Sequence, residues 1–133
     1  LFQNPEDQLF CATVEEDIAF GPFNLGWSRE KVKTAVKEIL EKLEIPGYEK
    51  RISSKLSGGE KRLVSLASVL VMQPELLLLD EPSSGLDELH LAKLEKILLN
   101  WSGTLIMISH EKDFSSKICS SEMRLSSGKI LSL

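Results

Sequence analysis

Long hydrophobic runs are missing from this sequence of 133 residues, and so are cysteine clusters and an excess of positive charge. No apolar run approaches the roughly 18–20 residues that a membrane-spanning helix needs. The two cysteines, Cys11 and Cys119, lie far apart without metal-ligand spacing, which favours buried or inert thiols in a reducing compartment. A net charge of −4 argues against non-specific binding of nucleic acid. The remaining composition, 42% apolar and 27% charged, is ordinary for one modest globular domain.

The beginning of the chain lacks a signal peptide, and its first residue is Leu1 rather than Met. We therefore expect a fragment, a processed product or an incomplete record of a longer chain. Internal repeats and low-complexity segments are also absent from the sequence.

The most informative stretch is Leu76–Leu79, a run of leucines that Asp80, Glu81 and Pro82 follow. This continuous apolar run predicts a short strand that is buried on both faces, as in a parallel sheet. Such a strand delivers the next residues to the carboxyl edge of the sheet, where open α/β folds bind ligands. Neighbouring side chains of an extended chain point opposite ways, so the two acids can do different jobs, one near a metal and one near a water. The alternative is a strand end followed by a solvated acidic turn.

A second buried strand is predicted at residues 104–108, with Ser109 and His110 at its carboxyl end. The lone histidine there can be structural or catalytic, because histidine titrates near neutral pH. A short helix at about 112–118 follows, and then a hairpin of two short strands around Ser127-Gly128.

Helices are predicted before and between these strands. Thr13 has the form of a helix cap, and residues 21–22 (Gly-Pro) are expected to end that helix. Ser28 is expected to cap a longer amphipathic helix. Asp87 is expected to cap the helix between the two strands, with His90 exposed in its first turn.

A turn at Leu56–Glu60 precedes a further long helix. Its two glycines allow a partner group to approach the backbone closely. The free N–H groups of the helix start suit an anion, Ser57 adds a hydroxyl donor, and Lys61 and Arg62 add positive charge. The alternative is a plain helix-entry turn. Together, the elements predict an α/β core with a helical insertion.

In this order and spacing, the motifs resemble the nucleotide-binding domain of the ATP-binding-cassette (ABC) ATPases across nearly the whole chain. The segments that carry the resemblance are Gln3 (Q-loop), Leu56–Glu60 (signature motif, which usually ends in Gln), Leu76–Glu81 (Walker B), Ser84–Asp87 (D-loop) and His110 (switch histidine). Three further segments look like the ATPases of cobalt/nickel importers and of energy-coupling-factor (ECF) vitamin importers: Phe2–Phe10, Thr13–Asp17 and Phe20–Pro22.

The resemblance implies a role for each matched residue. Glu81 would polarise the attacking water, and His110 would hold the geometry of the γ-phosphate and that water. Asp80 would act on Mg²⁺, mostly through water, since magnesium sheds its hydration shell reluctantly. Gln3 would sense the metal and the γ-phosphate and link the site to membrane subunits, while Asp87 would lie at a dimer interface.

The signature motif would serve a site in trans. Ser57, Gly58 and Gly59, with Glu60 of the same motif, would bind the γ-phosphate of an ATP held by the opposite subunit.

The phosphate-binding loop of that family, Gly-x₄-Gly-Lys-Ser/Thr, is missing. The only Gly-Lys pair is Gly128-Lys129; Ile130 follows it, and Met123 stands in place of the first glycine. The expected fold class is α/β, a partial P-loop NTPase (ABC ATPase) fold without the Walker A strand and the N-terminal β-subdomain. Residues 1–133 would form one incomplete domain: a Q-loop and helical signature subdomain at about 1–75, and part of a RecA-like parallel-sheet core at about 76–133. We therefore expect this chain alone not to bind or hydrolyse ATP measurably, although its parent protein would.

The function that the resemblance implies is the ATPase subunit of an importer for a metal ion or a vitamin, with ATP and Mg²⁺ as ligands. Its partners would be a second ABC ATPase subunit, identical or different, a transmembrane coupling subunit and a substrate-binding membrane subunit, at the cytoplasmic face of a prokaryotic membrane. No nucleic acid partner is expected. A helix of the coupling subunit would dock near residues 14–20 and the Gln3 loop.

Two alternatives stay open. A non-transport ABC ATPase typically carries a second cassette or a long coiled coil, and neither is visible in this sequence. A non-catalytic interaction module fits the missing phosphate-binding loop, but it leaves Glu81 and His110 without a purpose.

Overall fold

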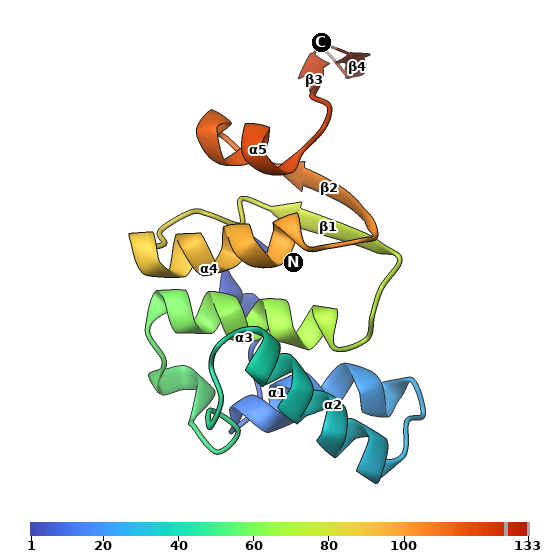
Figure 1. Cartoon of the computed structure of the whole chain (residues 1–133), viewed down its shortest axis with the longest axis vertical. Helices are drawn as coiled ribbons and strands as arrows, with labels where there is room; N and C mark the ends of the chain where they lie inside the picture. The colour runs from blue at the N-terminus through green and yellow to red at the C-terminus, as the bar shows by residue number, and fades with distance from the viewer. Residues whose placement is uncertain (127, 133) are drawn as a thin grey trace.

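The computed structural model of the chain describes residues 1–126 and 128–132. Helices α1 and α2 lie at one end, α3 and α4 follow side by side, and the strands and α5 lie beyond them (Figure 1). The elements are η1 (Pro5–Asp7), α1 (Val14–Asn24), α2 (Arg29–Lys42), η2 (Ser53–Lys55), α3 (Gly58–Leu70), β1 (Leu76–Asp80), α4 (Glu88–Leu99), β2 (Thr104–Ile108), α5 (Lys112–Ile118), β3 (Met123–Ser126) and β4 (Lys129–Ser132).

Strands β1 and β2 form a parallel pair in which Leu76 lies opposite Thr104 and Asp80 lies opposite Ile108. Helix α4 makes the crossover between them, as parallel strands require. The pair extends past its last residues, because the Glu81 amide donates to the Ile108 carbonyl at 2.9 Å. On the other edge of β1, the Leu1 amine donates to the Leu78 carbonyl at 2.7 Å. Parallel pairing therefore brings the residues after β1 and the residues after β2 to one edge.

The prediction that β1 is buried on both faces is wrong for this chain. Leu77 and Leu79 are 1% and 3% exposed, whereas Leu76 and Leu78 are 47% and 55% exposed. Strand β2 is likewise only half-buried, with Ile106 and Ile108 facing outward. The physical reason is that, in the part of the chain that the structure describes, helices such as α3 and α4 cover one face of the strand pair and leave the other face exposed (Figure 1).

The helix starts follow the predicted caps. The Ser28 hydroxyl accepts from the Lys31 amide, and the Asp87 carboxylate accepts from the His90 amide. At Thr13, the backbone amide donates to Glu16 Oε2 at 3.1 Å. These bonds satisfy amides that have no partner inside the helix.

The predicted end of α1 at residues 21–22 is wrong, because the helix continues to Asn24 with Pro22 inside it. Proline cannot donate a backbone hydrogen bond, so it normally breaks a helix interior. Here Pro22 is fully buried, and a Cβ on Gly21 would lie 2.5 Å from the sulfur of Met72. Close packing of α1 against the α3 region therefore holds the helix through the proline.

The core runs without interruption from the helical part into the strand-bearing part. Leu63 and Leu66 of α3 are fully buried in one cluster with Leu77 of β1 and Leu94 of α4. The predicted hairpin is confirmed as antiparallel strands β3 and β4, with Met123 opposite Ser132. Ser127 of its predicted turn lies outside the described residues.

Candidate functional site

Glu81 and His110 meet at the carboxyl edge of the parallel pair. The His110 amide donates to Glu81 Oε2 at 3.3 Å, and His110 Nε2 lies 3.3 Å from Glu81 Oε1. The Glu81 side chain is 12% exposed, whereas the imidazole of His110 is 94% exposed. A mostly buried carboxylate thus lies against a solvent-exposed imidazole.

The backbone and the carboxylate of Glu81 are both unusual. Its φ of +42° lies in the left-handed region, which a residue with a side chain seldom adopts. Its Oε1 is buried and makes no hydrogen bond. Strained residues and unsatisfied buried oxygens cluster at functional sites. Apart from the approach of His110 Nε2 at 3.3 Å, no hydrogen bond to Oε1 is present among the described residues, so this oxygen is still able to accept one.

Asp80 precedes Glu81 and ends strand β1 with an exposed carboxylate. The described residues contain no group of three or more His, Cys, Asp or Glu side chains that could hold a metal ion. One exposed carboxylate still fits Mg²⁺, because that ion is usually bound by one or two carboxylates plus waters and substrate phosphates.

Arg62, on the first turns of α3, links the segment of Gln3 to Glu81. Its buried guanidinium donates to the carbonyls of Phe2 at 2.7 Å, of Gln3 at 2.5 Å and of Glu81 at 3.2 Å. Burial lowers the pKa of Arg62, and the charge of Asp80 opposes this shift. The side chain of Gln3 itself is exposed. Arg62 therefore fixes the backbones of both segments, whereas the sequence had suggested that it adds positive charge for an anion at the turn.

The turn Ser57–Glu60 begins α3 with a reciprocal capping box. The Ser57 amide donates to Glu60 Oε2 at 2.8 Å, and the Ser57 hydroxyl accepts from the Glu60 amide at 3.3 Å. The amides of Gly58 and Gly59 belong to the first turn and have no acceptor within the helix. The turn thus has a fixed shape and presents free donors, as an anion site needs.

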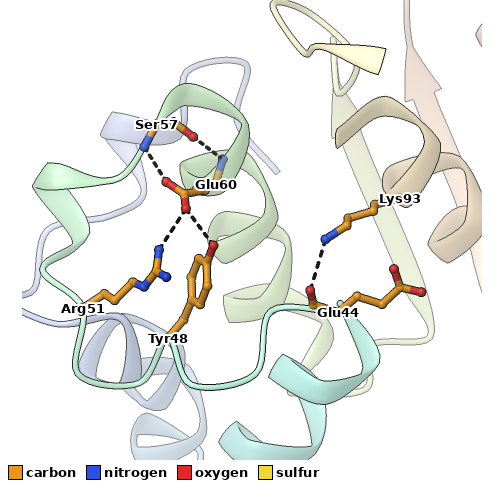
Figure 2. Close-up of polar contacts among 6 residues, drawn as sticks. All are labelled: Glu44, Tyr48, Arg51, Ser57, Glu60 and Lys93. Carbon is orange, nitrogen blue, oxygen red and sulfur yellow. Dashed lines mark hydrogen bonds and ion pairs between the residues drawn. The ribbon is translucent and has the colours of Figure 1, made fainter. Parts of the chain in front are cut away.

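Figure 2 shows that the other carboxylate oxygen of Glu60 is also engaged. Oε1 accepts from the Tyr48 hydroxyl at 2.7 Å and pairs with Arg51 Nη1 at 3.0 Å, and the Arg51 guanidinium lies 3.6 Å from the centre of the Tyr48 ring. The hydrogen bond from Tyr48, with that from Ser57, lowers the pKa of Glu60. This network ties the start of α3 to the segment before it. A separate bond in the same view, from Lys93 Nζ to the Glu44 carbonyl at 3.1 Å, ties α4 to the loop after α2.

Asp87 caps α4 and also contacts the ring of His90. Its Oδ1 accepts from the His90 amide at 2.9 Å and lies 2.7 Å from His90 Nδ1, and these bonds lower the pKa of Asp87. The expectation that His90 is exposed is wrong, since its side chain is only 16% exposed. The ring packs on Gly59, where a Cβ would lie 2.5 Å from His90 Cγ. The histidine therefore joins the start of α4 to the start of α3.

The structure brings Glu81 and His110 into direct contact, and it connects Gln3 to Glu81 through Arg62 and Asp87 to Gly59 through His90. Within the described part of the chain, no hydrogen bond or ion pair joins Ser57–Glu60 to Glu81 or His110. The burial of Arg62 had a signal in the sequence, because Leu66 and Leu70 of the buried stripe follow it at intervals of four residues. The contacts of Tyr48 and Arg51 with Glu60 had no such signal in the sequence.

Among the residues that the structure describes, no helix is both long enough and apolar enough to cross a membrane.

Comparison with known proteins gives concordant results. Residues 1–84 match the family described as "ABC transporter". A Brucella suis protein named as a putative ABC transporter ATP-binding protein is 48% identical over 98% of this chain and 55% of its own length. The energy-coupling factor transporter ATP-binding protein EcfA of Methanococcus maripaludis is 43% identical over 98% of this chain and 48% of its own length.

A solved structure agrees. CbiO1 of Clostridium perfringens, described as part of the ABC transporter complex CbiONQ, matches with a TM-score of 0.85 and 31% identity over 98% of this chain and 53% of that one. The chain thus spans about half the length of the relatives it matches. The matching family, relatives and fold together place the chain in the ABC transporter family of ATP-binding proteins.

Proposed function

We propose that the protein containing this chain is the ATPase subunit of an ABC-type importer, which couples ATP hydrolysis to uptake of a metal ion or a vitamin. The observation that carries the catalytic part is the contact of Glu81 with His110 at the carboxyl edge of β1 and β2, 3.3 Å apart. The importer class is supported by relatives named as energy-coupling factor ATP-binding proteins and by the likeness to CbiO1.

In this proposal, Mg²⁺ supplies charge neutralisation for the ATP phosphates when it is bound. Asp80 would hold the ion, mostly through water, with its exposed carboxylate. Glu81 accepts a proton from the attacking water at its orphan Oε1. His110, open to the ligand, holds the γ-phosphate in place, and Gln3 reports on the metal and the phosphate from the adjoining loop. Phosphoryl transfer needs mainly positioning and charge stabilisation, which are the contributions these residues can make.

The start of α3 would serve the ATP of a second ABC ATPase subunit. Ser57 supplies a hydroxyl and the amides of Gly58 and Gly59 supply free donors toward that γ-phosphate. Because both carboxylate oxygens of Glu60 are already engaged, we propose that Glu60 contributes by holding Ser57 rather than by touching the nucleotide. Asp87 lies at the same end of the helices and would border the partner subunit.

This chain carries no phosphate-binding loop motif. Without that nest of amides and its lysine, the triphosphate lacks its main cradle. We therefore propose that residues 1–133 alone neither bind nor hydrolyse ATP measurably and that the longer parent protein does both.

The exposed aromatic side of α1 is the proposed docking surface for a helix of the transmembrane coupling subunit. Phe10 and Phe20 pack edge to face with ring centres 4.9 Å apart, yet remain 66% and 49% exposed. Phe23, also on α1, and Leu25, directly after it, are exposed as well. With a substrate-binding membrane subunit as the further partner, the ATPase would work at the cytoplasmic face of a prokaryotic membrane.

Substitution of Glu81 by Gln in the full-length protein tests the catalytic assignment. The change keeps the shape of the side chain and removes its basicity. We expect Mg-ATP hydrolysis to fall on the order of 10²–10⁴-fold, the usual contribution of a general base. ATP binding should persist, and an ATP-bound dimer should accumulate in size-exclusion chromatography.

Two controls sharpen this experiment. Glu75→Gln makes the same chemical change one residue before β1, at the opposite end of the strand, and should leave the rate unchanged. The isolated 133-residue chain should show no Mg-ATP binding by calorimetry. Survival of hydrolysis in Glu81→Gln would overturn the role of Glu81. A full-length wild-type protein without ATPase activity would favour the non-catalytic interaction module instead. Failure of an active protein to associate with any membrane subunit would favour a non-transport ABC ATPase.

A further inference from the structure

The two glycines at the start of α3 have different surroundings. A Cβ on Gly58 would meet no atom within 4 Å. A Cβ on Gly59 would lie 2.5 Å from Cγ, 2.6 Å from Nδ1 and 2.8 Å from Cδ2 of His90. Neither glycine needs a positive φ, since both lie in helical backbone. Backbone conformation therefore does not explain either glycine, and only Gly59 is crowded by a neighbouring side chain.

The imidazole of His90 cannot easily move away from Gly59. The atom nearest to the added Cβ is Cγ, the ring atom that is bonded to the Cβ of His90. This atom moves only when the side chain rotates about χ1. That rotation would break the 2.7 Å contact between His90 Nδ1 and Asp87 Oδ1. The carboxylate of Asp87 is itself held in place by the 2.9 Å hydrogen bond that it accepts from the His90 amide. The ring therefore contacts a carboxylate that cannot move with it.

We propose that His90 is a positioning residue for the start of α3, and that Gly59 must be glycine because the imidazole occupies the space of its side chain. The packing of His90 on Gly59 does not depend on the proposed function, whereas the expected effect on pairing of two subunits rests on it. The ring joins the turn that would serve the partner's ATP to Asp87, which would border the partner subunit. Loss of the ring should therefore weaken ATP-dependent pairing of two subunits and leave ATP binding by each subunit unchanged.

The packing part is tested by thermal unfolding of the full-length ATPase without nucleotide, which removes any effect on phosphate binding. With His90 present, Gly59→Ala should lower Tm by about 3–6 °C, because overpacking displaces the ring or the helix. In a His90→Ala background the same change should raise Tm or leave it unchanged, since alanine is favoured over glycine in a helix. Gly58→Ala is the matched control and should show no dependence on residue 90.

If Gly59→Ala lowered Tm whether residue 90 is His or Ala, the packing part would be overturned. An equal drop in Tm for Gly59→Ala in both backgrounds would mean that the glycine is required for another reason, such as approach of a ligand to the backbone.

The positioning part is tested in the Glu81→Gln background, where ATP-bound dimers should persist. His90→Ala should raise the dimer Kd about tenfold while the Kd for ATP in the single subunit stays unchanged. His90→Asn, whose amide can replace Nδ1 as the partner of Asp87, should restore the dimer Kd to within about threefold. An unchanged dimer Kd in His90→Ala would overturn the positioning role. Absence of any ATP-dependent dimer in Glu81→Gln alone would instead contradict the proposed function, and the Tm comparison would still decide the packing.

Discussion

Replacement of Arg62 by Met should lower the stability of the fold more than the same replacement at any exposed arginine that the structure describes. Arg62 is 2% exposed, and its guanidinium donates to the carbonyls of Phe2, Gln3 and Glu81. Methionine has a similar apolar stem but no donors, so the substitution keeps much of the packing and removes the three hydrogen bonds. The segment that carries Gln3 and the segment that carries Glu81 would both lose their anchor on α3.

The magnitude follows from these contacts. A hydrogen bond from a charged donor contributes about 1.5–3 kcal/mol net, but bonds that share one side chain do not add. The substitution would also leave the three carbonyls without this donor. A buried carbonyl left without its partner costs about 1–3 kcal/mol, and the costs of three neighbouring carbonyls do not fully add. We therefore expect Arg62→Met to lower the free energy of unfolding by about 3–5 kcal/mol. Arg62→Lys should lose about half as much, because an ammonium cannot span the three carbonyls as a planar fork does.

Urea unfolding of the full-length ATPase, monitored by circular dichroism, measures this difference in the free energy of unfolding. An m-value that is the same for wild type and variant shows that only stability has changed. Arg29→Met is the matched control, since Arg29 is exposed at the start of α2 and should change stability by no more than about 0.5 kcal/mol. A loss below about 1 kcal/mol for Arg62→Met would refute the reasoning, because the buried guanidinium would then not be holding the two segments.

Two further predictions follow from the Glu60 network and from the aromatic surface of α1. Because hydrogen bonds from Tyr48 and Ser57 lower the pKa of Glu60 below its ordinary 4.5, its contribution to stability should be complete above that pH and disappear as pH falls through the lower folded value. Urea unfolding should show Glu60→Gln less stable than wild type by about 1–3 kcal/mol at pH 7, with the difference shrinking below pH 4.5; a difference that is constant with pH would contradict this. A photo-crosslinking phenylalanine at Phe20 should crosslink to the transmembrane subunit in the assembled importer, whereas one at Leu89, an exposed residue of α4, should not; consistent failure at Phe20 would place the docking surface elsewhere.

Local chemistry explains why most helix starts could be predicted. Ser28 and Asp87 are short polar residues whose side chains accept from amides three positions later, so the cap is encoded within one turn. The same holds for the sheet edge, since two parallel strands that pair directly bring Glu81 and His110 to the same edge.

Errors arose where distant packing overrides local preference. Residues 21–22 end a helix in most settings, but α1 passes through Pro22 because its side chain is buried in the contact with the rest of the helical part. His90 was expected to be exposed, because nothing within its own helix indicates that the start of α3 lies against it.

The sequence by itself determined the family motifs, the helix caps and the order of the elements, because each depends on residues close together in the chain. Only the tertiary structure decided that the Arg62 guanidinium joins the Gln3 segment to Glu81, that Tyr48 and Arg51 hold Glu60, and that His90 fills the space beside Gly59. These contacts join residues from different elements, and their geometry depends on how α3 packs against its neighbours. A one-dimensional pattern carries no record of that packing.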